Sequence, residues 1–280
     1  MGKILNGKKV ALILEEKIKE EIKKLKEKML FPRLAVINAT NNEASEMYLK
    51  MKMKKLKSIG LEVHAHILKE TSEKKVIQLI ESLNENKNFH GILVQFPLPK
   101  FFDKYKIMNS INPLKDVDGL TNINAKELMR GGELYIPCTP KGIISLLDYY
   151  NIEVIDKEVV ILGKSEIVGR PLAKIMYYKG ANVTICDSRT NNLEEEIQKA
   201  EILISAVGKA RFVKTRMIKK GAVIIDVGIN YFKRKIVGDI DYKRVKKKAS
   251  YITPVPGGVG PMTIISLAEN LVMAVKYQNK

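Results

Sequence analysis

A turn rich in glycine and serine joins an apolar run to a helix-like pattern in the second half of the chain. The run covers residues 159–162, and Gly163, Lys164, Ser165 and Gly169 follow it. Glycines let a backbone approach a phosphate closely, and the free N–H groups at a helix N-terminus favour negative charge. Ser165 stands where the usual Gly-x-Gly-x-x-Gly fingerprint has its second glycine. Taken alone, the turn fits a dinucleotide site or an ordinary strand-to-helix connection.

A second group of reactive side chains lies in the first half. Ser45, Tyr48 and Lys52 are spaced by three and four residues on a helix expected over 44–59, so they share one face. A lysine accepts a proton near neutral pH only if desolvation or nearby positive charge brings its pKa well below about 10.4. We expect Lys55 to supply such a charge. The plain alternative is a solvated helix face.

Two further polar sites follow along the chain. Residues 91–99 read as a buried strand that ends in Gln95 and two prolines, and residues 115–119 place Asp116 and Asp118 in a turn. Gln95 could instead satisfy loop backbone, and Asp116 could cap the turn.

The elements that must position these residues are apolar strands separated by helix-length segments. Strands are predicted at 34–37 in the first half and at 182–186, 202–207 and 223–227 after the glycine turn. Strands this continuously apolar suit a parallel sheet covered on both faces. A nucleotide-binding half from about 140 to 250 is the economical interpretation.

Composition agrees with a globular enzyme that has two cores. The chain has 280 residues, 45% hydrophobic and 29% charged. No apolar run is expected to reach the length of a membrane span, and the first residues lack a signal-peptide core. Cys138 and Cys186 fall in different predicted domains and cannot form a disulfide framework, so we expect a cytoplasmic protein.

The formal net charge of +18 raises the question of nucleic acid. The excess is mostly lysine spread along helices, the chain has no Trp, and no aromatic residues alternate with the basic ones. We therefore expect a lysine-biased solvated surface, with attraction of an anionic small substrate as the second interpretation and no nucleic-acid partner.

Six motifs, taken in order, resemble the bifunctional methylenetetrahydrofolate dehydrogenase/methenyltetrahydrofolate cyclohydrolase (FolD) family. They span nearly the whole chain and lie at 48–52, 91–99, 115–119, 137–140, 163–171 and 253–263. The ten-residue segment Pro-Val-Pro-Gly-Gly-Val-Gly-Pro-Met-Thr at 254–263 is far more specific than the glycine turn. The resemblance implies oxidation of 5,10-methylenetetrahydrofolate with NADP, then hydrolysis of the methenyl product to 10-formyltetrahydrofolate. These are reactions of one-carbon metabolism, which serves purine and amino-acid biosynthesis.

The resemblance also implies the architecture. An α/β folate-binding catalytic domain is expected over 1–138 plus 259–280, and a Rossmann-like domain with a parallel sheet over 139–258. A C-terminal helix would return to the first domain. A homodimer is expected, with no metal.

Site residues carried over from the family fall into two groups. Lys52 would be the catalytic lysine of hydrolysis, Tyr48 would pack against the folate, Gln95 would contact and tune Lys52, and Asp118 would bind the pterin. Gly257 and Gly258 would let the backbone close over the folate. Residues expected to bind the cofactor are Gly163, Lys164, Ser165, Ser188 and Ile229.

Some positions depart from the family pattern. Residues 39–43 replace the usual Val-Gly-Asp-x-Pro, Lys164 replaces an arginine, and Asp187 replaces a frequent histidine. Lysine lacks the planar fork suited to a 2′-phosphate, and an acid would rather accept bonds from a ribose hydroxyl. NADP is therefore the first expectation and NAD a close second. The alternatives to this function are another dinucleotide-dependent oxidoreductase, or a non-catalytic basic module that binds anions or nucleic acid.

Overall fold

The computed structural model describes residues 1–280 apart from 41–42, 70, 133, 234 and 280, and the side chains of 43–45 and 47–48. It divides into two compact units, which we name after their sheets. The six-stranded unit comprises Met1–Leu12 and Thr139–Thr263, and the three-stranded unit comprises Ile13–Cys138 and Ile264–Lys280.

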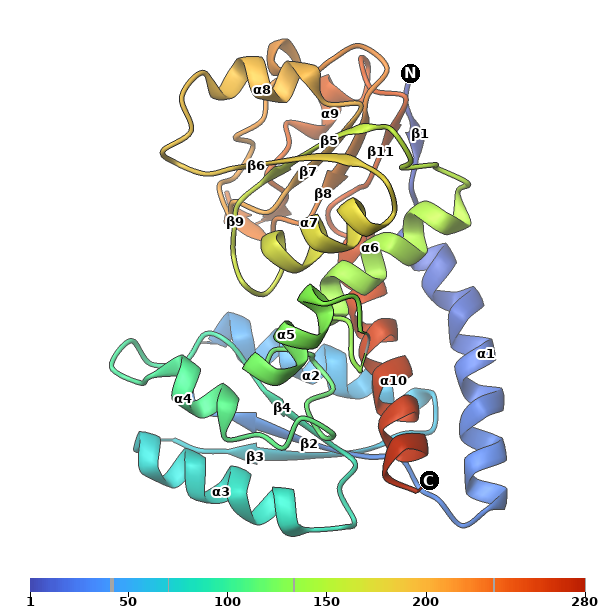
Figure 1. The fold of residues 1–280 in the computed structure, drawn as a ribbon, viewed down its shortest axis with the longest axis vertical. Helices are drawn as coiled ribbons and strands as arrows, with labels where there is room; N and C mark the ends of the chain where they lie inside the picture. Colours follow the sequence, from blue (N-terminus) through green and yellow to red (C-terminus); the bar gives the residue numbers. More distant parts are fainter. Residues whose placement is uncertain (41–42, 70, 133, 234, 280) are drawn as a thin grey trace. The chain divides into compact units, whose positions relative to one another are not determined.

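The six-stranded unit is built on a parallel sheet with strand order β1-β11-β8-β7-β5-β6 (Figure 1). Its strands are β1 (Lys3–Ile4), β5 (Glu158–Leu162), β6 (Asn182–Cys186), β7 (Ile202–Ser205), β8 (Val223–Asp226) and β11 (Tyr251–Ile252). The four strands predicted for this half are confirmed as β5 to β8. Because β1 pairs with β11, residues 1–12 group with this unit. This differs from the predicted boundary, which assigned them to the other domain.

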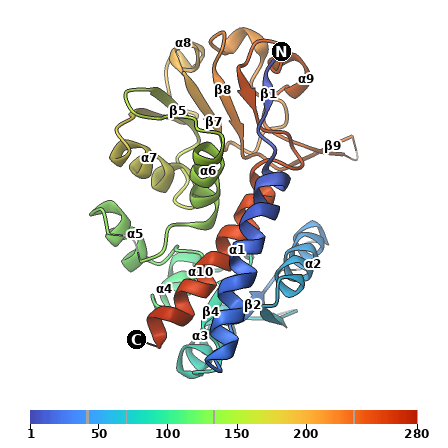
Figure 2. The same cartoon turned by 90° about the vertical axis from the view of Figure 1, so that its right-hand side faces the viewer.

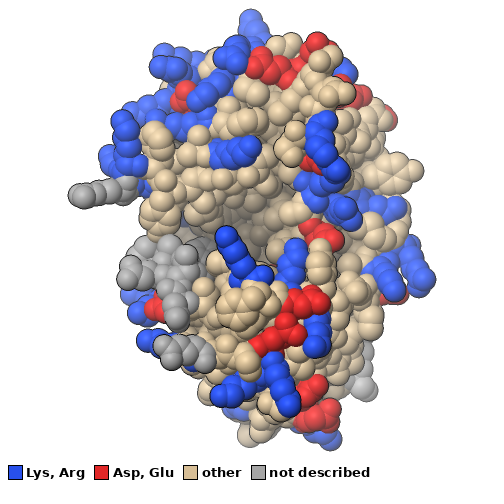
Figure 3. Space-filling view, turned by 90° about the vertical axis from the view of Figure 1, so that its left-hand side faces the viewer, with Lys and Arg blue, Asp and Glu red and all other residues tan. Residues whose placement is uncertain are grey.

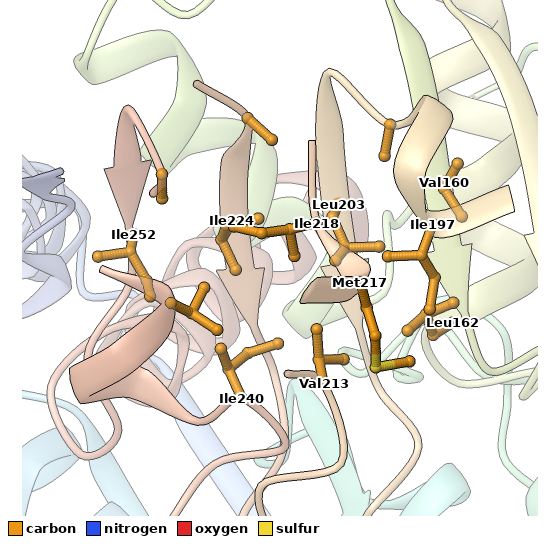
Figure 4. Close-up of a cluster of buried hydrophobic side chains, with 14 of the residues drawn as sticks. Val160, Leu162, Ile197, Leu203, Val213, Met217, Ile218, Ile224, Ile240 and Ile252 are labelled. Atoms are coloured by element: carbon orange, nitrogen blue, oxygen red, sulfur yellow. The ribbon is translucent and has the colours of Figure 1, made fainter. Parts of the chain in front are cut away.

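Helices cover both faces of this sheet, with α7 on one side and α8 and α9 on the other (Figure 1). The helical segments are α6 (Cys138–Tyr149), α7 (Gly169–Tyr178), α8 (Leu193–Lys199), the 3₁₀ turn η1 (Thr215–Met217) and α9 (Tyr242–Val245). An antiparallel hairpin follows β8, formed by β9 (Asn230–Phe232) and β10 (Lys235–Val237). Figure 4 shows one core layer, in which Val160, Leu203 and Ile224 of the strands meet Ile197 of α8. The three strand residues are paired in register across β5, β7 and β8, so their side chains point to the same face of the sheet.

The three-stranded unit holds a parallel sheet of order β3-β2-β4. Its elements are β2 (Arg33–Asn38), α2 (Glu43–Ser58), β3 (Glu62–Ile67), α3 (Glu73–Glu85), β4 (Gly91–Val94), α4 (Lys104–Asn109) and α5 (Asn122–Met129). Figures 1 and 2 show α3 on one side of the sheet and α2 on the other. Ile37 and Val94 pack with Ile80 of α3 in one core cluster. The predicted strand at 34–37 and helix at 44–59 are confirmed.

Two long helices, α1 (Gly7–Glu27) and α10 (Val259–Gln278), contain residues of both units. Among the described residues, α10 is the one helix long and apolar enough to cross a membrane. The prediction from sequence that no apolar run reaches the length of a membrane span is therefore wrong for this helix. Because 61% of that stretch is buried inside the protein, α10 has the burial of a core helix.

Lys and Arg side chains are dispersed over the face drawn in Figure 3, with Asp and Glu between them. Along the chain, several lysines form ion pairs within their own helix, such as Lys24 with Glu21 at 2.9 Å and Lys199 with Glu196 at 2.6 Å. Such pairs on an exposed surface contribute little stability each. The pattern is that of a solvated basic surface.

Candidate active site

Lys52 and Gln95 form the centre of the candidate site in the three-stranded unit. Lys52 lies on α2, is only 8% exposed, and donates a hydrogen bond from Nζ to Gln95 Oε1 at 3.2 Å. Gln95 directly follows β4, where its backbone N–H donates to Ile37 O at 2.8 Å and its Nε2 to Phe96 O at 2.7 Å. The side chain therefore satisfies loop backbone and contacts the lysine at the same time.

Burial lowers the pKa of Lys52, because desolvation disfavours the ammonium form, while Asp118 and Cys138 act in the opposite direction. The expectation that the charge of Lys55 lowers the pKa of Lys52 is wrong. Lys55 instead forms an ion pair with the buried Glu15 of α1, so its charge is already compensated. Loss of water is the main reason that this amine favours its neutral form.

A rigid turn presents Asp118, which is partly buried. The neighbouring Asp116 is fully buried, and its Oδ2 accepts hydrogen bonds from Thr121 N at 2.7 Å and Asn124 Nδ2 at 2.8 Å. This is the turn-capping role that the sequence left open for Asp116. Asp118 is thus the more exposed carboxylate of the pair.

Two buried residues that sequence reasoning missed also hold this turn. Asn270 of α10 is fully buried and donates from Nδ2 to Val117 O at 2.9 Å and Ile136 O at 3.0 Å. Lys115 donates from Nζ to three backbone carbonyls at the C-terminal end of α3, at 2.7 to 2.9 Å. A lone asparagine inside an apolar helix was the available signal for the first. For Lys115, a lysine next to an Asp-x-Asp turn gave no signal of a buried role.

The remaining predicted folate residues are placed as follows. Tyr48 lies on α2 four residues before Lys52, and its side chain is outside the described residues. Gly257 and Gly258 lie in the six-stranded unit, directly before α10. Gly257 has φ +108°, and a Cβ on Gly258 would lie 2.6 Å from Pro254 O, so both positions require glycine.

The glycine turn between β5 and α7 is as tight as its sequence predicts. Gly163 has φ +99°, and a Cβ there would lie 2.5 Å from Ala206 O. A Cβ on Gly169 would lie 2.0 Å from Gly163 O. The Ser165 hydroxyl accepts hydrogen bonds from Val168 N at 3.2 Å and Gly169 N at 3.4 Å, so serine caps the start of α7.

A pocket of about 360 Å³ opens at the carboxyl ends of β5, β6 and β7. It is lined by Leu162, Gly163, Ser165, Cys186, Asp187, Ser188, Leu193, Ala206, Val207, Lys209 and Phe212. Three of the five predicted cofactor residues therefore meet in one pocket. Lys164 and Ile229 are not among its lining residues, and Ile229 is 53% exposed.

Asp187, which lines this pocket, forms ion pairs with Lys164 and Arg189. Its Oδ2 lies 2.8 Å from Lys164 Nζ and 3.2 Å from Arg189 Nη2, and its Oδ1 accepts a bond from Arg189 N at 2.9 Å. The hydrogen bond from Lys164, followed by those from Arg189, lowers the pKa of Asp187. The carboxylate is therefore ionised, and both cations are paired with it.

Comparison with known proteins decides what these two units are. The catalytic-domain model of the tetrahydrofolate dehydrogenase/cyclohydrolase family matches residues 5–118, and the NAD(P)-binding-domain model of the same family matches residues 137–279. The chain belongs to the tetrahydrofolate dehydrogenase/cyclohydrolase family. This membership confirms the predicted α/β fold and the two predicted activities, methylenetetrahydrofolate dehydrogenase and methenyltetrahydrofolate cyclohydrolase.

Members of this family align along the whole chain. The bifunctional protein FolD of Thermodesulfovibrio yellowstonii is 46% identical, over 100% of this chain and 98% of that protein. The crystal structure of the bifunctional enzyme FolD from Campylobacter jejuni superposes with a TM-score of 0.97 at 41% identity, covering 99% of this chain and 100% of that one. The Trypanosoma brucei enzyme, solved with NADP and an inhibitor, gives 0.95 at 31% identity, covering 100% and 99%.

Proposed function

We propose that Lys52, Gln95 and Asp118 carry the folate chemistry of this dehydrogenase/cyclohydrolase. The observation that carries the proposal is a buried lysine, hydrogen-bonded at 3.2 Å to an uncharged partner, inside the catalytic domain of the family. A neutral amine can accept a proton, which an exposed lysine at neutral pH cannot do.

In the hydrolytic step, water adds through its oxygen to the methenyl carbon, and one of its protons passes to Lys52 Nζ. The bond from that carbon to one folate nitrogen then breaks as the hydroxyl gives up its remaining proton and becomes the formyl carbonyl. The departing nitrogen takes up a proton, and the formyl group stays on the other nitrogen. Asp118 accepts hydrogen bonds from donor groups of the pterin ring and orients it, and Gln95 holds the lysine amine in place. Tyr48, one helical turn before Lys52, packs against the folate, and the backbone at Gly257 and Gly258 closes over it.

The residues of the six-stranded unit fit a dinucleotide. Gly163 and Gly169 bring backbone close together at the start of α7, where anions are favoured, and Ser165 and Ser188 line the adjoining pocket. The nicotinamide supplies the hydride acceptor when bound. Hydride transfer needs no side-chain acid, so the protein's task is orientation and exclusion of water. Lys164 and Ile229, which do not line the pocket, also belong to the proposed cofactor site.

NADP is the proposed cofactor, with NAD as the second candidate. A relative 31% identical was solved with NADP. Lys164 and Arg189, both paired with Asp187, leave one net positive charge in their cluster, which suits a phosphate. We also propose a cytoplasmic homodimer. Its support is the family resemblance for the dimer and, for the compartment, two buried cysteines that are not joined in a disulfide.

The test is the variant Lys52→Met in a spectrophotometric assay of methenyl formation and decay, run with NADP and then with NAD. Hydrolysis should fall at least about a hundredfold, within the range of general-base effects. Lys54→Met, two residues along the same helix and exposed, is the matched control and should keep both activities. Undiminished hydrolysis by Lys52→Met would refute the assignment.

A further inference from the structure

A fully buried carboxylate, Asp239, lies outside every motif that pointed to function. It follows the β9–β10 hairpin of the six-stranded unit. Its Oδ2 accepts hydrogen bonds from Val207 N at 2.8 Å, Gly208 N at 3.2 Å and Ser205 Oγ at 3.2 Å. Its Oδ1 accepts from Lys209 N at 2.9 Å and also receives a bond from an asparagine side chain of β9.

Three consecutive backbone N–H groups, at residues 207, 208 and 209, therefore converge on one side chain. These residues form the loop after β7, and Val207 and Lys209 line the pocket that also contains Gly163 and Ser165. A loop would otherwise leave such N–H groups to water, and its backbone would be free to take other conformations. Charge-assisted bonds to a single acceptor select one conformation among them.

The position of Asp239 is itself fixed by contacts with Asp226 and Gly228. Its backbone N–H donates to Asp226 Oδ1 at 2.9 Å, and that of Ile240 donates to Asp226 Oδ2 at 3.0 Å. On the other side, a Cβ on Gly228 would lie 2.1 Å from Asp239 Oδ1, so the glycine leaves just enough room for the carboxylate. The aspartate is held in place before any ligand arrives.

We infer that Asp239 is a positioning residue for the dinucleotide, acting through the backbone of the 207–209 loop. The inference rests on the proposed cofactor site, and it adds a residue that touches neither cofactor nor substrate. An aspartate is needed because both oxygens accept hydrogen bonds. Asparagine would present an N–H₂ group to one set of N–H donors and leave them unpaired.

The test is Asp239→Asn, with the dissociation constant for NADP measured by calorimetry and hydrolysis of the methenyl substrate measured without cofactor. NADP binding should weaken at least about tenfold, corresponding to one or more unpaired donors. The cofactor-independent hydrolysis should stay within about twofold. Val245→Ala is the matched control: Val245 is fully buried in the same unit and does not line the pocket, so this variant lowers stability without weakening NADP binding.

Equal NADP affinity in Asp239→Asn and the wild type would overturn the inference, as would a parallel loss of hydrolysis. A wild type that binds neither NADP nor NAD would instead refute the proposed cofactor. Amide hydrogen exchange in the wild type provides a readout that does not depend on the variant's folding. The amides of residues 207–209 should exchange as slowly as those of β7, and rapid exchange there would contradict the role assigned to Asp239.

Discussion

Protonation of Asp226 should make the stability of the six-stranded unit depend on pH. Asp226 is 2% exposed, and burial raises its pKa to about 7 from an ordinary value of 3.8. Three backbone N–H groups, of Asp239, Ile240 and Gly228, favour the charged form at 2.9 to 3.1 Å but do not offset desolvation, to which the nearby charge of Asp239 adds.

The sign follows from linkage. The folded state binds the proton of Asp226 more tightly than the unfolded state does. The contribution of Asp226 to the free energy of unfolding is therefore full below about pH 3.8 and is lost as pH rises through 7. Between pH 5 and pH 8 the folded carboxyl ionises, whereas the unfolded one is already ionised throughout. At about 1.4 kcal/mol per pKa unit, this contribution falls by about 2 to 3 kcal/mol over that interval.

The variant Asp226→Asn keeps the shape of the side chain and removes the titration. Urea unfolding followed by circular dichroism, at pH 5 and pH 8, gives the free energy of unfolding for both proteins. The wild type should lose about 2 to 3 kcal/mol more than the variant on going to pH 8. The buried control Val245→Ala should keep the wild-type pH dependence. Equal pH dependence in wild type and Asp226→Asn would refute the reasoning, and a carboxyl ¹³C titration of Asp226 with a midpoint near 4 would do so directly.

The other predictions concern one residue each. Asp187→His releases Lys164 and Arg189 from their carboxylate, so it should raise the NADP/NAD ratio of kcat/KM; an unchanged ratio would mean that this cluster does not face the adenosine ribose. Asp118→Ala should impair oxidation and hydrolysis together, by about 1–3 kcal/mol per lost bond, and loss of one activity alone would make Asp118 a step-specific catalyst instead. Lys115→Met leaves three carbonyls at the end of α3 without their donor and should lower the free energy of unfolding by about 2–4 kcal/mol, with wild-type stability as the contrary result.

Elements whose apolar residues recur at strand or helix spacing could be predicted from sequence alone. The strand expected at 182–186 matches β6, and the helix expected over 44–59 matches α2 within one residue. Short or polar elements gave no such signal. β1 has two residues and exists because β11 offers an edge to pair with, while β3 carries two histidines that break the apolar pattern.

Hydrogen-bond partners, unlike elements, could not be predicted, because they are far apart in the chain. Lys55 sits three residues from Lys52, which made it the obvious charge to invoke, yet its partner Glu15 lies forty residues away on another helix. Asp239 is separated from the loop that it holds by about thirty residues. Spacing along the sequence gives which residues share an element, and packing decides which of them meet.

Desolvation accounts for two buried groups of opposite charge in the same way. It lowers the pKa of Lys52 and raises that of Asp226, so each shifts toward its neutral form. What differs is the partner. Gln95 accepts a bond from Lys52 without adding a negative charge that would favour the ammonium form, and this supports the base that we propose for hydrolysis. Asp226 receives backbone N–H groups that tether the segment carrying Asp239, so its contribution is to the shape of the dinucleotide pocket rather than to proton transfer.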